Sequence, residues 1–390
     1  QKVAGWLFYI AVIVALIAFV VWMVIEDVPT AVIFTITTLV IACPHALGLA
    51  IPLVTARSTS LGASRGLLVK DRQALEIAQD ADVMILDKTG TLTTGEFKVL
   101  DVKFLNDKYT KEEIIALLAG IEGGSSHPIA QSIISFAEQQ NMRPASFDSI
   151  DVISGAGVEG KAGGHRYQLI SQKAYGRNLD MDIPKGATLS VLVENDDAIG
   201  AVALGDELKP TSRELIKALK KNNIQPIMAT GDNEKAAQGA AVDLGIEYRS
   251  NQSPQDKYEL VKTLKDEGKK VIMVGDGVND APSLALADVG IAIGAGTQVA
   301  LDSADVILTQ SDPGDIGSFI DLAHKTTRKM KQNLFWGAGY NFIAIPLAAG
   351  ILAPIGITLS PALGAILMSV STVIVAINAM LLSLDPKNNG

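Results

Sequence analysis

The chain has 390 residues, which is enough for two or three domains, and 48% of its residues are hydrophobic. Its formal net charge is −9 and it contains no block of basic residues, so the composition argues against nucleic acid as a partner. The single cysteine excludes a disulfide framework and indicates a reducing compartment for the soluble part of the chain.

Hydrophobic residues are concentrated in four nearly uncharged segments. These segments cover residues 3–25, 28–56, 334–352 and 355–384. Each is about as long as the roughly 20 residues that a helix needs to cross a bilayer. The first segment is too long for a signal peptide and is followed at once by the second. The sequence therefore predicts four transmembrane α-helices, and buried helices of a soluble protein are the disfavoured alternative.

Basic residues flank the apolar segments on one side only. Those after the second segment and before the third are Arg57, Arg65, Lys70, Arg72, Lys325, Arg328, Lys329 and Lys331. The short connections within each pair of segments carry no Lys or Arg. By the positive-inside rule, the central region and both ends of the chain lie in the cytoplasm. We expect an integral membrane protein, located in the cell (plasma) membrane.

The region between the two pairs of segments reads as a soluble α/β protein. Helices are expected at residues 211–221, 234–244 and 255–267, and strands at 83–86, 225–229 and 270–274. This alternation predicts a parallel, doubly wound sheet with functional loops at the carboxyl ends of its strands. Residues 99–205 differ, with Gly-rich turns, a strand at 190–194 and a helix at 129–140. They are interpreted as an insertion into that domain.

The segment 87–93, Asp-Lys-Thr-Gly-Thr-Leu-Thr, directly follows the first of these strands. A carboxylate in this position can attack a phosphorus atom and become an acyl phosphate, so Asp87 is the candidate nucleophile. Lys88 and the threonine hydroxyls would offset the charge of the transferred phosphoryl group. Phosphatases with such a nucleophile commonly have a second acid two residues later, where this chain has Thr89. Without that acid, the phosphorylated enzyme should persist.

A second polar loop, Thr-Gly-Asp at residues 230–232, also follows a predicted strand. Its Asp232 should therefore lie near Asp87 at the same edge of the sheet. Thr230 and Gly231 are expected to hydrogen-bond the phosphoryl oxygens. Lys257, at the start of an amphipathic helix, is a candidate for neutralising the acyl phosphate.

A third loop, Gly-Asp-Gly-Val-Asn-Asp-Ala-Pro, occupies residues 275–282. Hard oxygen ligands at a phosphoryl-transfer site suit Mg²⁺, which takes one or two protein carboxylates, waters and the phosphate. We expect Asp276 to bind Mg²⁺ directly, beside Asp87 and the carbonyl of Thr89. Asp280 is expected to be an indirect or alternate ligand.

Residues 43–45, in the middle of the second apolar segment, are Cys-Pro-His. Pro44 removes a backbone donor and opens the helix, which frees carbonyl groups within the membrane. Cys43 and His45 place a thiolate and an imidazole beside this opening, and such ligands select Cu(I), Ag(I) or Zn(II) over Na⁺, K⁺ or Ca²⁺. A histidine at bilayer depth is costly, so we interpret the motif as a metal site.

Taken in order, the motifs at 87–93, 230–232 and 275–282 resemble the cytoplasmic core of the P-type ATPases, a family of the haloacid-dehalogenase-like superfamily. The resemblance covers nearly the whole chain, since the apolar segments fall where this family places its membrane spans. It implies ATP-driven ion transport through a phosphoaspartate at Asp87, with ATP and Mg²⁺ as cofactors.

The resemblance also implies a fold, namely an α/β haloacid-dehalogenase-like phosphorylation domain with an inserted α+β nucleotide-binding domain, plus four transmembrane α-helices. Two membrane helices with the Cys-Pro-His motif are expected at residues 1–60, and two more with a C-terminal tail at 327–390. The phosphorylation domain is expected at 61–98 and 206–326, and the nucleotide-binding domain at 99–205.

The Cys-Pro-His motif resembles that of heavy-metal P-type ATPases, specifically the copper-transporting subgroup with histidine in the third position. Tyr340-Asn341 and Met368-Ser369 in the last two apolar segments agree with this subgroup, and Met368 would add a soft thioether ligand. Residues 334–384 carry no charged residue, whereas a zinc or cadmium pump would be expected to have one there. Copper is therefore the expected cargo, without a distinction among Cu(I), Cu(II) and Ag(I). Another soft or borderline metal such as Zn²⁺ is the alternative.

Two stretches of the insertion match nucleotide-binding elements of the family. The match implies that His127 faces the adenine ring and that Glu122 faces its amino edge. Gly155 and Gly157 would let the backbone approach the phosphates. Ser126 stands where a glutamate commonly precedes the histidine, so this part of the predicted site departs from the family pattern.

The actuator domain of the family, which delivers water to the phosphoaspartate, is not recognisable in the sequence, and residue 1 is Gln rather than Met. We therefore expect the chain to be the carboxy-terminal part of a longer pump. Its partners would be the actuator domain and remaining membrane helices, the copper or silver ion, and the lipid bilayer. A membrane-anchored phosphatase of the same superfamily is the alternative, but a mere anchor needs neither His127 nor the Cys-Pro-His motif.

Overall fold

The structure is a computed structural model that describes residues 2–42, 45–125, 127–153, 156–177, 179, 186–232, 234–275, 278–294 and 302–384. The chain divides into two compact units. The first unit combines Gln1–Asp80 with Ser318–Gly390, and the second unit is Ala81–Gly317. The first unit therefore unites the two ends of the sequence that hold the apolar segments.

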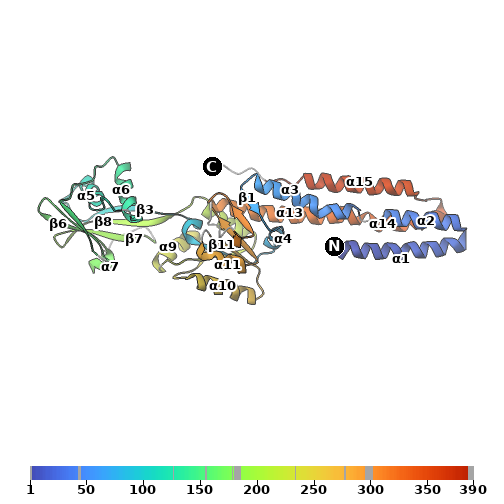
Figure 1. The fold of residues 1–390 in the computed structure, drawn as a ribbon, viewed down its shortest axis with the longest axis horizontal. Coiled ribbons are helices and arrows are strands. Elements are labelled where there is room, and N and C mark those ends of the chain that lie inside the picture. Colours follow the sequence, from blue (N-terminus) through green and yellow to red (C-terminus); the bar gives the residue numbers. More distant parts are fainter. Residues whose placement is uncertain are drawn as a thin grey trace. The chain divides into compact units, whose positions relative to one another are not determined.

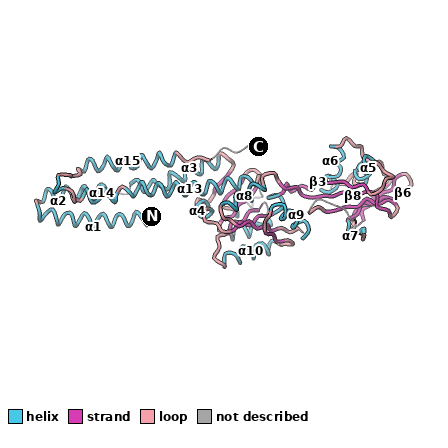
Figure 2. Tube along the Cα trace, turned by 180° about the vertical axis from the view of Figure 1, so that it is seen from behind, coloured by secondary structure: helices cyan, strands magenta, loops and turns pink. Residues whose placement is uncertain are grey.

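The first unit is mainly helical. Its elements are α1 (Lys2–Ile25), α2 (Val28–Ile41), α3 (His45–Ala63), β1 (Leu67–Val69), α4 (Gln73–Ala78), most of α13 (Pro313–Gly339), α14 (Asn341–Ala348), a 3₁₀ turn (Ala353–Ile355) and α15 (Pro361–Met380). Helix α2 packs against α1, α14 and α15, and α15 also packs along α3 (Figure 1, Figure 2). Two of these helices begin with a side-chain cap. Asp27 accepts a hydrogen bond from a backbone N–H in the first turn of α2, and Ser360 accepts one from a backbone N–H in the first turn of α15.

Three helical segments of the described chain are long and apolar enough to cross a membrane, by length and composition. They are Gly5–Ile25, Val28–Ala63 and Pro361–Met380. The second segment is divided into α2 and α3 on either side of Pro44, which lies outside the described residues. Residues 334–352, expected to be one membrane helix, are also divided. Helix α13 ends at Gly339 and α14 begins at Asn341, because nearby glycines weaken the helix.

Aromatic packing closes one end of the helical unit. The rings of Trp22 and Phe34 stack with centroids 4.5 Å apart, and Trp22 Nε1 donates to the Ala349 carbonyl at 2.9 Å. Gly350 has a φ of +86°, and a Cβ at this position would lie 2.8 Å from Trp22 and 2.9 Å from Phe34. The turn after α14 therefore requires glycine both for its backbone and for its space.

A chain of polar side chains links three helices of the same unit. Lys329 donates to Asn378 Oδ1 at 2.9 Å, and Asn378 donates to Asn333 Oδ1 at 2.7 Å. Asn333 is fully buried and donates to the carbonyl of Ala50 at 3.1 Å. These contacts join α13, α15 and α3, because polar groups inside an apolar bundle must find partners in neighbouring helices.

The second unit contains a parallel sheet with helices packed against it. Its strands are β2 (Val83–Asp87), β9 (Gln225–Ala229), β10 (Glu247–Arg249), β11 (Val271–Gly275), β12 (Val289–Ile293) and β13 (Val306–Leu308), in the spatial order β13-β12-β11-β2-β9-β10. Its helices are α8 (Ser212–Lys221), α9 (Glu234–Leu244), α10 (Pro254–Asp266) and α11 (Ala281–Leu286). Every residue of β2, β11 and β12 is buried, as expected for central parallel strands covered on both faces.

A six-stranded antiparallel sheet is inserted between β2 and β9 in the sequence. Its strands are β3 (Thr93–Phe104), β4 (Ser149–Ile153), β5 (Gly157–Ala162), β6 (His165–Ser171), β7 (Thr188–Glu194) and β8 (Asp197–Leu208), in the spatial order β3-β8-β7-β6-β5-β4. Helices α5 (Lys111–Ile121) and α6 (Pro128–Gln139) pack on this sheet, and the short α7 (Gln172–Tyr175) follows β6 (Figure 1). The core between helices and sheet includes Ile114, Leu118, Ile133 and Leu192.

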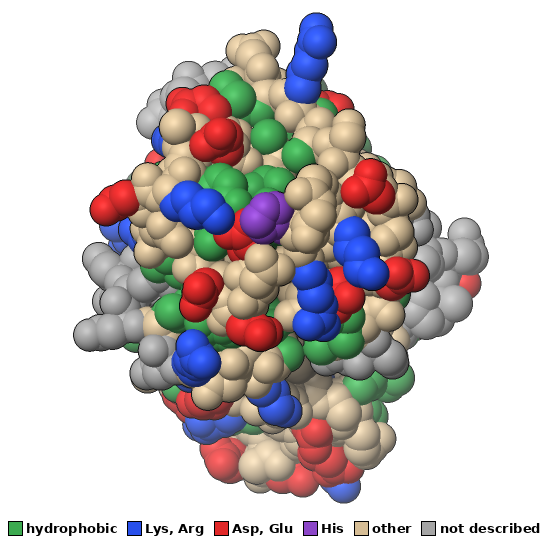
Figure 3. All heavy atoms as spheres, turned by 90° about the vertical axis from the view of Figure 1, so that its left-hand side faces the viewer, with side chains coloured by type: hydrophobic (Ala, Val, Ile, Leu, Met, Phe, Trp, Pro, Cys, Tyr) green, Lys and Arg blue, Asp and Glu red, His purple; other side chains and the backbone are tan. Residues whose placement is uncertain are grey.

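Figure 3 shows the end of the second unit that is formed by the antiparallel sheet and its helices. Acidic and basic side chains are interspersed on this face, with hydrophobic side chains between them near the centre of the view. Such a mixture of charges is typical of a solvent-exposed protein surface.

Candidate functional site

Three charged side chains meet at the carboxyl end of β2. The Nζ of Lys257 lies 2.7 Å from Oδ1 of Asp87 and 2.8 Å from Oδ1 of Asp280. Only 11% of the Asp87 side chain, 8% of Lys257 and 2% of Asp280 is exposed. Buried charges are costly unless they are paired, so each member of this group stabilises the others. The structure brings together three site residues that the sequence predicted from two strand-end loops and the start of a helix.

The sheet and one helix produce this convergence. Strand β2 ends at Asp87, and the neighbouring β11 ends at Gly275, shortly before Asp280. A Cβ at Gly275 would collide with the Asp280 carboxylate, so glycine is required for this close approach. Lys257 lies near the start of α10. Ser253 caps this helix, because its side chain and that of Asp256 each accept a hydrogen bond from the other's backbone N–H.

The two carboxylates control the charge of Lys257. Burial lowers the pKa of this ammonium, but the charges and hydrogen bonds of Asp87 and Asp280 outweigh burial and raise the pKa above its ordinary value. Lys257 therefore remains protonated at neutral pH. Its charge is available to neutralise a negative group placed on Asp87.

A second ion pair lies beside this group. The buried Lys88 pairs with the carboxylate of Asp232, which is more exposed. Thr230 is also buried, and its Oγ1 accepts a hydrogen bond from the Asp232 N–H at 3.1 Å. The polar loop after β9 is therefore held against the residue that follows Asp87.

The strand register explains why this loop reaches the nucleophile. Asp87 is paired with Ala229, so Thr230 and Gly231 follow at the same edge of the sheet. The side chain of Thr89 is exposed, which leaves its position open to solvent.

Two residues that the sequence analysis did not single out support the turn after Asp87. Asp206 accepts hydrogen bonds from Thr93 Oγ1 and from the Gly95 N–H, the latter at 2.9 Å. Lys209 donates to the carbonyl of Gly90, whose φ of +73° favours glycine. The signal available in the sequence was an acid and a lysine spaced three apart at the end of a strand.

A cavity of about 600 Å³ adjoins Lys88. Lys209 and Arg213 contribute cationic groups to its lining, and Asp206, Glu207 and Asp243 contribute carboxylates. Cationic side chains placed this close to a candidate phosphorylation site suit the phosphate groups of a substrate, because charge-assisted hydrogen bonds to phosphate are strong.

The donor set at this edge of the sheet fits Mg²⁺, which prefers oxygen ligands and few protein carboxylates. Asp87 offers one carboxylate, whereas Asp276, the predicted main ligand, lies outside the described residues. Asp280, predicted as an alternate ligand, is bound to Lys257 in this structure. No cluster of three or more His, Cys, Asp or Glu side chains that could hold a metal occurs in the described part of the chain.

The predicted nucleotide-binding residues lie around the connection between α5 and α6. Glu122 is buried at the end of α5, and burial raises its pKa while the charge of His127 opposes the increase. The exposed His127 begins α6 and accepts a hydrogen bond from the second residue of that helix at 3.3 Å. A Cβ at Gly157 would collide with the Leu169 carbonyl of β6. Gly155 lies outside the described residues.

A cleft of about 850 Å³ adjoins His127, between β3 and α6. Its lining includes the exposed Phe97, the lysine next to it and Phe136. Of the predicted nucleotide-binding residues that the structure describes, His127 lines this cleft, whereas Glu122 and Gly157 do not.

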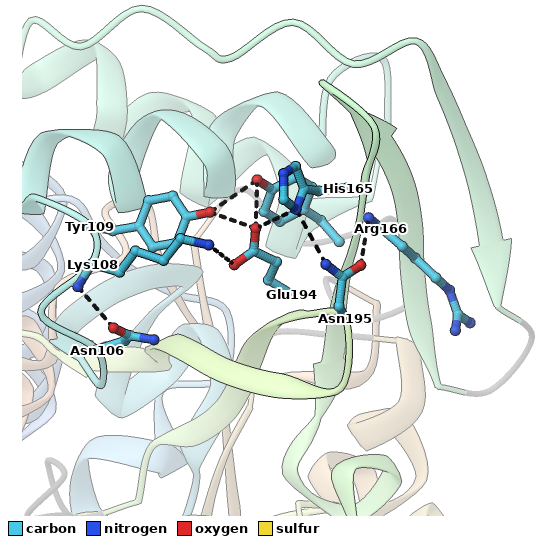
Figure 4. Close-up of polar contacts among 8 residues, drawn as sticks. Asn106, Lys108, Tyr109, His165, Arg166, Glu194 and Asn195 are labelled. Carbon is cyan, nitrogen blue, oxygen red and sulfur yellow. Dashed lines mark hydrogen bonds and ion pairs between the residues drawn. The ribbon is translucent and has the colours of Figure 1, made fainter.

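Another buried carboxylate, Glu194, lies at the end of β7 (Figure 4). Tyr109 donates to its Oε1 at 2.7 Å, His165 Nδ1 lies 3.0 Å from the same oxygen, and Lys108 lies 3.0 Å from Oε2. Tyr167 adds a longer contact of 3.3 Å. Burial raises the pKa of Glu194, but the hydrogen bonds from Tyr109 and Lys108 outweigh burial and hold the pKa below its ordinary value. This group ties the loop before α5 to β6 and β7.

Predicted metal ligands of the first unit lie around the junction of α2 and α3. Tyr340 donates to the carbonyl of Ile41 at 3.3 Å, two residues before Cys43. Asn341 is fully buried, and neither atom of its amide has a hydrogen-bond partner among the described residues. Cys43 and the side chain of His45 lie outside the described part of the chain.

Helix α15 approaches the same junction. A Cβ at Gly364 would lie 2.6 Å from Ile41, so α15 passes close to the end of α2. Met368, about one turn later, is half-buried, whereas Ser369 is exposed. The Ser369 hydroxyl donates to the Ala365 carbonyl of its own helix at 2.9 Å. The structure therefore places Met368 closer than Ser369 to the interior of the unit.

Comparison with known proteins decides the family. A family model described as haloacid dehalogenase-like hydrolase matches residues 81–288, and a second model of the same description matches residues 257–320. The copper-exporting P-type ATPase B of Enterococcus hirae is 52% identical to 98% of this chain. The chain belongs to the haloacid dehalogenase-like hydrolases and, within them, to the P-type ATPases.

This P-type ATPase chain is also similar to solved structures. The crystal structure of a zinc-transporting PIB-type ATPase in an E2.Pi state matches with a TM-score of 0.84 and 30% identity, over 96% of this chain and 62% of that one. The catalytic domain of a CPx-ATPase matches with a TM-score of 0.52 and 32% identity, over 66% of this chain and 96% of that one. The chain spans about half the length of the curated relatives it matches, such as 52% of the Enterococcus hirae protein.

Proposed function

We propose that the chain is the catalytic and membrane part of an ATP-driven copper-exporting pump that forms a phosphoaspartate at Asp87. The observation that carries this proposal is the buried group of Asp87, Lys257 and Asp280 at the carboxyl end of a central parallel strand. The cargo is supported by relatives named as copper-exporting P-type ATPases, which are 52% and 47% identical to nearly all of this chain.

Asp87 is the nucleophile of the proposed reaction. One of its carboxylate oxygens forms a bond to the γ-phosphorus of ATP, while the bond from that phosphorus to the bridging oxygen breaks and ADP leaves with the electron pair. Lys257, 2.7 Å from Asp87, stabilises the negative charge that gathers around the phosphorus. Lys88 and the Thr230 hydroxyl lie on the side of the adjoining loop and orient the phosphoryl oxygens.

Mg²⁺, when bound by Asp87, Asp276 and the Thr89 carbonyl, supplies further neutralisation of the phosphate charge. Asp280 holds Lys257 in place through its 2.8 Å contact. Because the exposed Thr89 replaces an acid that could activate water, the acyl phosphate persists until water is delivered from elsewhere. The actuator domain and remaining membrane helices of a longer pump are the proposed partners for this step.

The antiparallel sheet and its helices form the proposed nucleotide-binding domain. His127 and Glu122 are its candidate adenine contacts, and Gly155 and Gly157 its candidate phosphate contacts. The cationic side chains in the cavity beside Lys88 support the placement of the triphosphate near Asp87.

The proposed transport site lies where α2, α3, α14 and α15 meet. Its ligands are Cys43, His45, Asn341 and Met368, with Tyr340 holding the carbonyl of Ile41. The unpartnered buried amide of Asn341 supports this assignment, because such a group is costly unless a ligand satisfies it. Ser369 is a more distant candidate because its hydroxyl already has a partner.

Zn²⁺ is the second candidate cargo, because a solved structure of a zinc-transporting ATPase is 30% identical to this chain. The proposed location is the plasma membrane, with the phosphorylation and nucleotide-binding domains in the cytoplasm. This orientation rests on the basic residues that flank the apolar segments.

Metal-stimulated ATPase activity of the full-length protein in liposomes tests this function. Cu(I) and Ag(I) are expected to stimulate turnover, and Cys43→Ala is expected to remove the stimulation while leaving phosphorylation by inorganic phosphate. Met368→Leu should weaken the response to Cu(I), whereas Met380→Leu, at an exposed position of the same helix, is the matched control. Stimulation by Zn²⁺ alone would reverse the assignment of the cargo.

A further inference from the structure

A cleft of about 610 Å³ lies along α13 in the first unit. Its lining contains two cationic side chains, Arg328 and Lys331, and two aromatic ones, Phe335 and Trp336. Gln332 from the same helix and Gln79 from the end of α4 complete the lining with amides. Cationic, amide and aromatic groups therefore share one cavity, which neither phosphoryl transfer nor metal transport uses.

The spacing of these residues makes the cleft a single face of α13. Positions 328, 331, 332 and 335 are three or four residues apart, which places them one above the other on a helix. Arg328 and Lys331 are exposed, and no ion-pair partner of either is found among the described residues. The face changes from cationic to aromatic within two helical turns.

The change from cationic to aromatic side chains along α13 occurs where the apolar part of the helical unit, called the apolar layer below, begins. Leu334 packs against Leu7 and Leu47, and Leu7 lies at the beginning of the candidate membrane span Gly5–Ile25. Lys331 and Arg328 therefore lie about 4.5 Å and about 9 Å outside the apolar layer, at 1.5 Å per helical residue. The headgroup region of a bilayer is about 5–7 Å thick on each side.

Aromatic residues of α1 mark the same level. Trp6 is 71% exposed and Tyr9 is 66% exposed, on either side of Leu7. Tryptophan and tyrosine gather at the membrane–water interface, where one part of the ring is apolar and the other polar. In a bilayer at this level, the aromatic part of the cleft would face acyl chains and the cationic part would face headgroups.

We propose that this cleft binds one anionic phospholipid of the cytoplasmic leaflet. The headgroup phosphate lies between Arg328 and Lys331, the amides of Gln79 and Gln332 donate to the headgroup, and the acyl chains lie along Phe335 and Trp336. Because α13 leads directly to Tyr340 and Asn341, the bound lipid fixes the depth of that helix in the bilayer. The inference rests on the membrane location of the first unit, and neither on the cargo nor on phosphorylation.

Fluorescence quenching in lipid nanodiscs tests this proposal on the full chain without turnover. The signal of Trp336 is the difference between the unchanged protein and Trp336→Phe. Brominated phosphatidylglycerol is expected to quench this signal at a lower mole fraction than brominated phosphatidylcholine does. Arg328→Gln and Lys331→Gln should each weaken the preference about fivefold, as expected for one cationic residue at an anionic surface.

Lys325→Gln is the matched control, because Lys325 is on the same helix but pairs with Asp321 at 3.0 Å and does not line the cleft. It should retain the preference for phosphatidylglycerol. Equal quenching by the two lipids contradicts the site, and equal losses in Lys325→Gln and Arg328→Gln reduce it to diffuse surface charge. If inorganic phosphate abolishes the preference for phosphatidylglycerol, the cleft is a site for soluble anions instead.

Discussion

Two buried ionic groups of the second unit have similar contacts but different surroundings. In the first, one ammonium of Lys257 is shared by Asp87 and Asp280, at 2.7 and 2.8 Å. In the second, the single carboxylate of Glu194 accepts hydrogen bonds from Tyr109 at 2.7 Å and from Lys108 at 3.0 Å. The first lies where central parallel strands end, and the second lies at the end of an antiparallel strand.

The difference shows that burial and ion pairing do not identify a reactive site by themselves. Around Lys257 there are more carboxylates than cations, so the group carries a negative charge that suits Mg²⁺ and a nucleophilic oxygen. Around Glu194 the donors outnumber the carboxylate, so its oxygens are occupied by hydrogen bonds. The first arrangement suits the proposed phosphoryl transfer, and the second stabilises the packing of β6, β7 and the loop before α5.

Replacing the shared ammonium should have the largest effect. Lys257→Met removes the ammonium that the buried Asp87 and Asp280 share, which should destabilise the parallel sheet by about 3–5 kcal/mol and abolish phosphoenzyme formation. Hydrogen exchange of β2 and β11 measures the first effect, and labelling with γ-³²P-ATP the second. Lys265→Met, in the same helix but in a partly exposed pair with Asp288, should cost less than about 1 kcal/mol and keep phosphorylation. Equal effects of the two variants would remove the distinction drawn for Lys257.

Removing the negative charge of Glu194 should reduce stability less than Lys257→Met does, and it should leave phosphoenzyme formation unchanged. Glu194→Gln weakens the hydrogen bonds from Tyr109 and Lys108, so we expect a loss of about 1–3 kcal/mol confined to β6, β7 and the start of α5. Hydrogen exchange of these elements reports the loss, and the initial rate of phosphoenzyme formation at saturating ATP should be unchanged. A large decrease in that rate would place Glu194 in the reaction.

The smallest expected effect is the pH dependence of the same group. The pKa of Glu194 is lower in the folded protein than its ordinary value of 4.5. Its contribution to stability is therefore fully present above pH 4.5 and is lost as the pH falls through the lower, folded value. The difference in exchange protection between unchanged protein and Glu194→Gln should shrink as the pH is lowered below 4.5. A difference that grows on acidification would contradict the assigned direction.

Local patterns predicted much of the second unit. The expected strand at 225–229 and helix at 234–244 coincide with β9 and α9, because strong apolar periodicity and flanking turn residues define them. Loops at the carboxyl ends of parallel strands converge by topology, so the proximity of the Asp232 loop to Asp87 could be predicted from sequence order, and Asp232 pairs with the residue that follows Asp87.

Features that depend on packing between distant segments were not predictable in this way. The contacts of Asp206 with the turn after Asp87 depend on how β3 pairs with β8, which no local pattern specifies. The group around Glu194 likewise needs β6, β7 and a loop in register. The interruption between α13 and α14 was missed because hydrophobicity alone does not show where a membrane helix breaks.

Phosphorylation of Asp87 is the central claim, and labelling of two aspartate variants tests it most directly. The unchanged protein should incorporate acid-stable, hydroxylamine-labile label from γ-³²P-ATP, and Asp87→Asn should incorporate none. Asp82→Asn is the matched control, because Asp82 precedes the same strand at its opposite end and accepts from the Lys270 N–H at 2.8 Å. It should be labelled like the unchanged protein. Hydroxylamine-labile label that survives in Asp87→Asn would contradict the account.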